Sequence, residues 1–222
     1  MGGAIQPTVE RFPMRIAPTV RGLFALAVIA GSAALLPGSL AGAADEPAAG
    51  TSSTTARALV RDVNNNFLGT VVLQGSSGNR IAIAGQLSGI APGFHGFHIH
   101  AVGICNPTAT DPTGAVVPFV TAGGHLNPGG AGHGSHAGDL PLLLVGRDGV
   151  TRSVVETDAV TFANIFDADG SAFIVHAAPD NYANIPSRYT SSTTGLPGPD
   201  AATLTTGDSG GRFACGVITR VS

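Results

Sequence analysis

The chain has 222 residues, 43% of them hydrophobic, which is enough to bury the core of one domain of ordinary size. Its formal net charge is −3, and its 11 basic residues, all arginine, form no run or stripe. These values exclude a typical nucleic-acid partner, because proteins of that class displace counterions from phosphates with a concentrated basic surface.

Residues 1–43 have the pattern of a secretory signal peptide. Three arginines precede an apolar run at residues 23–36, and Ala41-Gly42-Ala43 offers a small-residue cleavage site. The alternative is a membrane anchor, but the run covers about 14 residues, and a bilayer span needs roughly 20. We therefore expect cleavage, export to the periplasm or the extracellular space, and no stable membrane span in the mature chain.

The mature chain left by that cleavage has eight arginines against thirteen acidic residues, a formal net charge of −5. Residues 44–55 are small or polar and predict a flexible lead-in. Cys105 and Cys215 both remain after cleavage. Two cysteines in an exported chain are expected to pair, the alternative being two free thiols in an oxidising compartment.

From residue 56 onward, short apolar or alternating runs between turn residues are typical of an antiparallel all-β domain. Asn64-Asn65-Asn66 predicts a hairpin, because Asn tolerates positive φ. We expect about eight strands, no helix of consequence and no internal repeat. The predicted strands are 56–63, 67–74, 80–87, 96–100, 140–145, 150–157, 171–176 and 212–218.

Two long segments, 101–138 and 177–211, resist strand assignment. Loops of this length are rare in a compact domain unless they carry function. The first contains three histidines and one cysteine, and the second begins directly after His176 and ends directly before Arg212. We therefore expect both loops to be functional.

All seven histidines lie between residues 95 and 176. His98 and His100 flank Ile99 in a predicted strand, so both imidazoles face one side and can bind one metal, although such a pair alone is more often incidental. Four imidazoles suit copper or zinc, and three imidazoles with a carboxylate suit zinc. The further candidate ligands are His125, His133, His136, Asp139 and His176.

Other interpretations of these residues fit less well. Seven separate surface histidines would have to cluster by coincidence. No serine lies in the sharp turn that a Ser-His-Asp hydrolase needs, and no helix follows the glycines to make a phosphate-binding loop. Asp167-Ala168-Asp169-Gly170 lacks the remaining ligands of a calcium loop and predicts a turn.

Four segments resemble the signature motifs of the copper–zinc superoxide dismutase family, in the family's order, within residues 56–219. They are Gly93-Phe94-His95-Gly96-Phe97-His98-Ile99-His100, Gly124-His125-Leu126-Asn127-Pro128, His136-Ala137-Gly138-Asp139-Leu140-Pro141 and Arg212-Phe213-Ala214-Cys215-Gly216-Val217-Ile218. The resemblance implies that residues 56–222 form an eight-stranded antiparallel Greek-key barrel or sandwich with two long functional loops. It also implies an enzyme that converts two superoxide anions and two protons to dioxygen and hydrogen peroxide at a copper centre bridged to zinc.

The resemblance also implies a role for each candidate residue. The copper ligands would be His98, His100, His125 and His176, and the zinc ligands would be His125, His133, His136 and Asp139. His125 would bridge the two ions and carry a proton in catalysis, and Arg212 would hold the superoxide anion close to copper. Asp180 matches a carboxylate that hydrogen-bonds one ligand of each ion, His95 matches a structural histidine, and Cys105 and Cys215 match the family's disulfide.

The chain departs from the family's usual pattern in two places. Two residues separate His133 from His136, where most members have a longer excursion. Segment 177–211 is longer than usual, and its Asn181-Tyr182-Ala183-Asn184-Ile185-Pro186 has no clear counterpart. Because the segment has several acidic residues against one arginine, substrate steering by this loop is in question.

Three functional readings follow from these residues. The leading one is the dismutase, as a monomer or a homodimer. The second is a non-catalytic protein that stores or delivers copper, which would need neither the bridging His125 nor Arg212. The third is a dismutase that works with copper alone and leaves the zinc site weak or empty.

Overall fold

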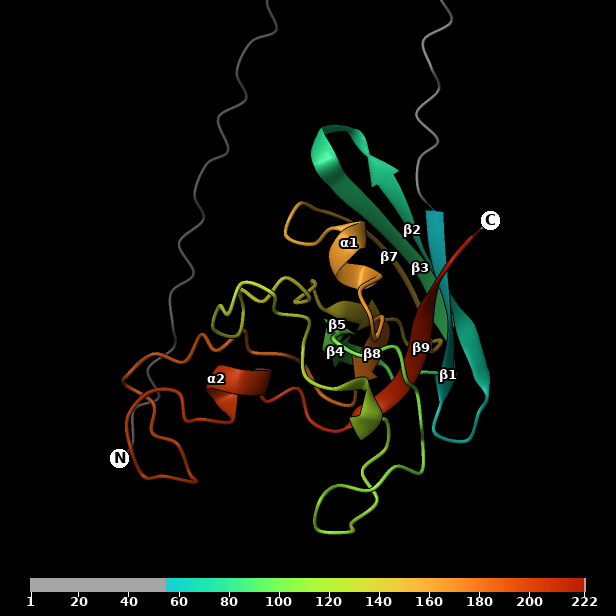
Figure 1. Cartoon of the computed structure of the whole chain (residues 1–222). Helices are drawn as coiled ribbons and strands as arrows, with labels where there is room; N and C mark the ends of the chain where they lie inside the picture. The colour runs from blue at the N-terminus through green and yellow to red at the C-terminus, as the bar shows by residue number, and fades with distance from the viewer. Residues whose placement is uncertain (1–54, 222) are drawn as a thin grey trace, which may run out of the picture. The chain divides into compact units, whose positions relative to one another are not determined.

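The computed structural model describes residues 55–221, and there the chain folds into antiparallel strands joined by long loops (Figure 1). The predicted signal peptide and all but the last residue of the predicted lead-in lie outside this range. The strands are β1 (Thr55–Asp62), β2 (Phe67–Ser76), β3 (Arg80–Ser88), β4 (Gly93–His95), β5 (Phe97–His100), β6 (Leu143–Val145), β7 (Val150–Thr157), β8 (Ala172–His176) and β9 (Arg212–Arg220).

The strands close on one another in an order that differs from their order in the chain. Seven of them form the sheet β5-β8-β9-β1-β2-β3-β7, and β4 pairs with β6. β4 and β5 are two parts of one extended run, and β6 lies beside β7 across a tight turn, so the neighbours form a ring. Because β3 pairs with β7 and β5 with β8, the connections are of the Greek-key kind. The predicted all-β antiparallel fold is confirmed.

The first hairpin follows from the alternation of side chains in β1. Ala56, Ala58 and Val60 are fully buried, while the residues between them face outward. Asn65 takes a positive φ of 65° in the turn, and the carboxylate of Asp62 accepts hydrogen bonds from two backbone N–H groups of the same turn. The predicted Asn hairpin is therefore present.

Two predicted strands begin three residues away from the observed start, whereas the ends of the others agree within two residues. The predicted strand 96–100 extends back to Gly93 but is broken at Gly96. The N–H of Gly96 donates to Ala178 O and its carbonyl accepts from His176 N, so neither group pairs with β6. The predicted strand 140–145 begins three residues later, at Leu143. Pro141 has no N–H to donate to a ladder, and the N–H of Leu142 donates to the hydroxyl of Tyr182.

The helices within residues 55–221 are single turns. α1 (Phe162–Ile165) is started by a capping box between Thr161 and Asn164, and α2 (Thr203–Thr206) lies in the second long loop. Two 3-10 turns, η1 (Ser77–Asn79) and η2 (Val120–Ala122), complete the set. None of the described helices is long and apolar enough to cross a membrane.

The core lies inside the ring of strands and places the histidines of β5 against the loops. Phe97 and Ile99 point into the core, where the Phe97 ring stacks on Phe173 with centroids 5.1 Å apart. His98 and His100 point the opposite way, yet they are 0% and 1% exposed because the two long loops cover them. Figure 1 shows the second long loop, with α2, on the side away from β1, β2 and β3.

A disulfide between Cys105 and Cys215 ties the first long loop to β9. It joins residues 110 positions apart, and closing a loop of that length is worth roughly 4–5 kcal/mol in the chain-entropy view. Phe119, Ala122 and Ile174 pack around it in a small apolar cluster. The predicted pairing is confirmed.

Candidate metal centre

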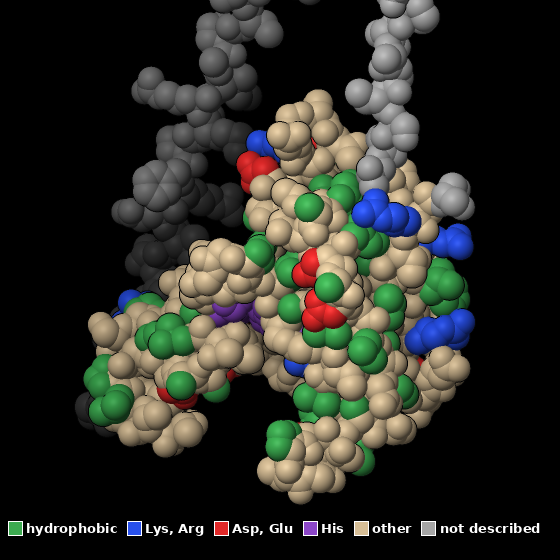
Figure 2. Space-filling model, viewed as in Figure 1, with side chains coloured by type: hydrophobic (Ala, Val, Ile, Leu, Met, Phe, Trp, Pro, Cys, Tyr) green, Lys and Arg blue, Asp and Glu red, His purple; other side chains and the backbone are tan. Residues whose placement is uncertain are grey.

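Two groups of side chains, which share His125, bring their nitrogen and oxygen atoms together beneath the long loops. Within each group one atom per residue lies within 4.8 Å of the others. Histidine side chains are visible between two lobes of the surface in Figure 2. The first group is His98, His100, His125 and His176, and the second is His125, His133, His136 and Asp139.

Neighbouring strands and a closely packed loop bring the first group together. His98 and His100 alternate with core residues on β5, and His176 ends β8, which pairs with β5. The loop that carries His125 lies along β5, since Leu126 N donates to Ile99 O at 2.8 Å and Ile99 N donates to Gly138 O at 2.9 Å. A side chain at Gly138 would collide with that carbonyl of Ile99, so the close approach requires glycine.

The free nitrogens of the first group fit a metal ion. His98 Nδ1, His100 Nε2 and His176 Nε2 are buried and have no hydrogen-bond partner among the described residues. The other nitrogen of each ring donates a hydrogen bond, to Asp180 Oδ2 at 2.7 Å, to Gly123 O at 2.9 Å and to Gly210 O at 3.1 Å, in that order. One nitrogen held by the protein and one left free is the arrangement of metal-binding histidines.

Burial also favours the neutral form that a metal needs. It lowers the pKa of His176 to about 3 and the pKa of His100 well below its ordinary value, and it lowers the pKa of His98 as well. Neutral imidazoles present lone pairs at neutral pH. An all-imidazole set of this kind suits copper.

The second group fits a tetrahedral ion of the zinc type. His125 Nδ1 lies 2.8 Å from Asp139 Oδ1, and His136 Nδ1 lies 3.3 Å from each of those two atoms. His133 Nδ1 is buried without a hydrogen-bond partner among the described residues and lies 3.4 Å from Asp139 Oδ2. Three imidazole nitrogens and one carboxylate oxygen around one point are a common zinc ligand set.

The backbone of the zinc-side loop orients Asp139. Its Oδ2 accepts hydrogen bonds from Gly134 N at 2.8 Å and His136 N at 3.0 Å, which turns Oδ1 toward the imidazoles. Burial alone would raise the pKa of Asp139, but His125, His133 and the N–H of His136 lower it overall. The carboxylate is therefore ionised, as a metal ligand must be.

Asp180 connects the two groups. Its Oδ2 accepts a hydrogen bond from His98 Nε2 at 2.7 Å, and its Oδ1 accepts one from His133 Nε2 at 2.8 Å. Burial alone would raise the pKa of Asp180, but these two bonds and one from Tyr182 N lower it to about 2. One ionised carboxylate thus fixes which nitrogen of each ring faces its group.

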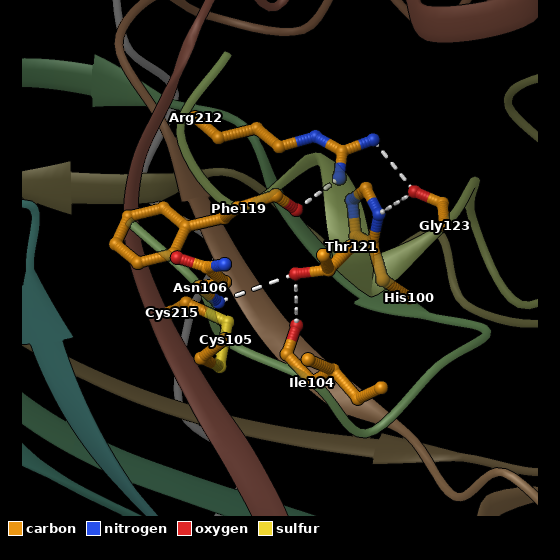
Figure 3. Close-up of a disulfide and its surroundings, with 9 residues drawn as sticks. All are labelled: His100, Ile104, Cys105, Asn106, Phe119, Thr121, Gly123, Arg212 and Cys215. Atoms are coloured by element: carbon orange, nitrogen blue, oxygen red, sulfur yellow. Dashed lines mark hydrogen bonds between the residues drawn. A yellow bond between two sulfur atoms is a disulfide. The ribbon is translucent and has the colours of Figure 1, made fainter. Parts of the chain in front are cut away.

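Arg212 begins β9 beside the first group. Its guanidinium donates to Phe119 O at 2.5 Å and to Gly123 O at 2.6 Å, and Gly123 O also accepts the hydrogen bond from His100 (Figure 3). Burial lowers the pKa of Arg212, yet a guanidinium stays charged at neutral pH. A fixed positive charge is therefore joined through one carbonyl to a candidate copper ligand.

An open pocket of about 610 Å³ gives solvent access to these residues. His100, His125, His136 and His176 line it together with Arg212. Thr205, Thr206 and Asp208 of the second long loop complete its rim. A small anion can reach the first group beside the guanidinium.

His95 lies near the site without contributing to it. Its Nδ1 faces His176 O at 2.8 Å and its Nε2 faces Ala91 O at 2.9 Å, so neither nitrogen is available to a metal. This geometry agrees with the structural role expected for it.

Sequence reasoning missed the backbone groups and glycines that hold the ligands. The carbonyls of Gly123 and Gly210 orient His100 and His176. Because every residue has a backbone carbonyl, the residue type does not indicate which carbonyls make such contacts. Gly207, at a φ of 62°, lies so close to Asp180 and His133 that any side chain there would collide with both. Its place directly after the single turn α2 is the signal that could have drawn attention to it.

Comparison with known proteins agrees with this geometry. Residues 67–218 match the family described as copper/zinc superoxide dismutase. The chain is 48% identical over 131 residues to a copper–zinc superoxide dismutase of Mycolicibacterium paratuberculosis; the match covers 58% of this chain and 57% of that relative's length. It is 32% identical over 179 residues to the Deinococcus radiodurans enzyme, over 76% of this chain and 86% of the relative.

The fold has solved counterparts as well. The structure of a superoxide-dismutase-like protein from Bacillus subtilis aligns with a TM-score of 0.56 at 30% identity, over 72% of this chain and 96% of that one.

Proposed function

Since the chain belongs to the copper/zinc superoxide dismutase family, we propose that it catalyses the dismutation of superoxide. The reaction would convert two superoxide anions and two protons to dioxygen and hydrogen peroxide. The observation that carries the proposal is the set of free, buried imidazole nitrogens of His98, His100 and His176 beside the fixed charge of Arg212. Metal storage needs only the free imidazole nitrogens, whereas catalysis on an anion needs the positive charge of Arg212 as well.

His98, His100, His125 and His176 would hold copper, which when bound supplies one-electron chemistry. His125 Nδ1 faces Asp139 on the zinc side, which leaves its Nε2 for the copper side. There Nε2 can hold a proton and give it to the product. His133, His136 and Asp139 would hold zinc and keep the ring of His125 in place.

Arg212 would bind the substrate. Superoxide is a small anion, and the predicted mature chain has a formal net charge of −5, so it is repelled at long range. The guanidinium at the pocket provides a local attraction. Its two carbonyl contacts hold it beside His100 rather than free in solvent.

The rival function is storage or delivery of copper without catalysis. Bound metals and the rate of superoxide disappearance, measured on one purified sample, separate the readings. The proposal requires copper and rapid dismutation together. Copper-loaded protein without dismutase activity would support storage, and active protein without zinc would support a copper-only enzyme.

The zinc site gives a prediction of its own. Asp139→Ala should lose zinc and keep part of the copper-dependent activity, because Asp139 belongs to the second group alone. A ligand that binds only the folded chain, present at a free concentration 1,000 times its Kd, adds about 4 kcal/mol to the free energy of unfolding. Loss of zinc should therefore lower the Tm by about 10 °C. Metal analysis by mass spectrometry beside a thermal melt measures both effects.

Asp158→Ala is the matched control, since the Asp158 side chain is 74% exposed and belongs to neither group. It should leave zinc content and Tm unchanged. Wild-type protein that takes up copper but no zinc would contradict the prediction and favour the copper-only reading.

We also propose that the enzyme acts outside the cytoplasm, in the periplasm or the extracellular space. The signal-peptide pattern of residues 1–43 and the Cys105–Cys215 disulfide support this location. N-terminal sequencing of protein recovered from the extracytoplasmic fraction should begin near residue 44, and a chain that retains residues 1–43 in the cytoplasm would contradict it. The homodimer stays a prediction that light scattering can test.

A further inference from the structure

Tyr182 links the second long loop to the segment that follows the zinc-side carboxylate. Its hydroxyl accepts a hydrogen bond from Leu142 N at 2.8 Å and donates one to Leu140 O at 3.3 Å. Leu140 directly follows Asp139, and Pro141 between the two leucines has no N–H of its own. One side chain thus satisfies two backbone groups immediately after a candidate ligand.

The backbone of Tyr182 reaches the other side of the same site. Its N–H donates to Asp180 Oδ1 at 2.7 Å, the oxygen that also accepts the hydrogen bond from His133 Nε2. Tyr182 is therefore joined to Asp139 through its side chain and to His133 through Asp180. No other described residue is bonded both to the carboxylate of Asp180 and to the segment at 140–142.

The backbone at Tyr182 and Ala183 has an unfavourable conformation that surrounding contacts must stabilise. Tyr182 and Ala183 have φ values of 54° and 56°, in the left-handed region that residues other than glycine rarely adopt. The zinc-side loop packs directly on it, because a Cβ at Gly134 would lie 2.5 Å from Tyr182 O. Strained backbone of this kind persists where surrounding contacts fix it, and it clusters at functional sites.

We propose that Tyr182 is a positioning residue for the zinc site. By fixing the segment after Asp139 and the carboxylate of Asp180 together, it holds Asp139 and His133 in their ligand arrangement before the ion binds. A site ordered in advance loses less entropy on binding and holds its ion more tightly. The inference rests on the zinc site of the proposed function and gives a role to Tyr182 within segment 181–186 of the long loop.

The test is the affinity of copper-free protein for zinc, measured by competition with a chelator. Tyr182→Phe keeps the ring and removes both hydroxyl hydrogen bonds. Loss of a group hydrogen-bonded directly to a metal ligand typically weakens metal binding about 10- to 100-fold. The Tyr182 hydroxyl bonds to the backbone just after Asp139, so we expect a rise in the zinc Kd at the lower end of that range, about tenfold. Tyr189→Phe, in the same loop and 55% exposed, is the control and should bind zinc like the wild type.

Thermal melts with and without zinc distinguish positioning from general stabilisation. The rise in Tm that zinc causes should be smaller in Tyr182→Phe than in Tyr189→Phe. An unchanged zinc Kd in Tyr182→Phe would overturn the inference, even if the metal-free variant melts lower, because the hydroxyl would then only stabilise the fold. Wild-type protein that binds no zinc would overturn the zinc site itself, a result separate from equal affinities in the two variants.

Discussion

Replacing His176 with alanine should reduce superoxide dismutation to the background rate while leaving a folded, disulfide-bonded domain. The substitution removes one of the three free, buried nitrogens around which the first group is built. It leaves Asp180, and with it the second group, untouched, because Asp180 bonds to His98 and His133. The rate is measured after copper loading, together with the copper content and a thermal melt.

His98→Ala should abolish activity as well, at a larger cost in stability. His98 is fully buried, and its loss would leave Oδ2 of the ionised Asp180 without the hydrogen bond it accepts. Thr205→Ala, which alters the rim of the same pocket without removing a nitrogen, should retain activity. Substantial activity in copper-loaded His176→Ala protein would refute the copper assignment.

Substitutions of Arg212 should slow the reaction in the order Glu, then Ala, then Lys, with Lys the mildest. A glutamate reverses the charge beside the pocket, an alanine removes it, and a lysine keeps it without the forked contact to Phe119 O and Gly123 O. For the wild type, kcat/KM should fall as salt rises if the local field of Arg212 outweighs the net charge of −5, because salt at 0.1 M, with a Debye length near 10 Å, screens the attraction of the guanidinium for the anion. A rise in kcat/KM would instead show that salt chiefly relieves repulsion by the net charge.

Arg147→Glu is the control for net charge. Arg147 lies in the exposed turn between β6 and β7 and does not line the pocket, but its substitution changes the total charge by the same amount as Arg212→Glu. It should alter the rate far less. Equal rates in the Glu, Ala and Lys variants of Arg212, at equal copper content, would show that its charge does not guide the substrate.

Local sequence predicted most of the strands to within two residues at each end and named the side chains that the structure gathers into the two groups. Alternation in 56–63 predicted which side chains of β1 are buried, because successive side chains of a strand point to opposite faces. The same rule placed His98 and His100 on one face of β5. Imidazole and carboxylate are also recognisable as ligand types without any knowledge of the fold.

Tertiary structure decided how those ligands are oriented. His98 meets Asp180 across 82 positions of the chain, and His100 meets the carbonyl of Gly123 across 23. These contacts exist because strands far apart in sequence pair and the disulfide holds the first long loop to β9. Which ring nitrogen stays free for a metal depends on them and not on neighbouring residues.

The residues around Tyr182 show most clearly the difference between what the local sequence predicts and what the tertiary structure decides. The sequence offers a tyrosine in a polar loop, with no periodic pattern to say which way it points. Only the folded chain brings its hydroxyl to Leu140 and Leu142, some 40 positions away. The sequence gives the side-chain type at each position directly. A hydrogen bond, however, needs two groups at a fixed distance and angle, and for residues so far apart in the chain the packing of the whole domain sets that geometry.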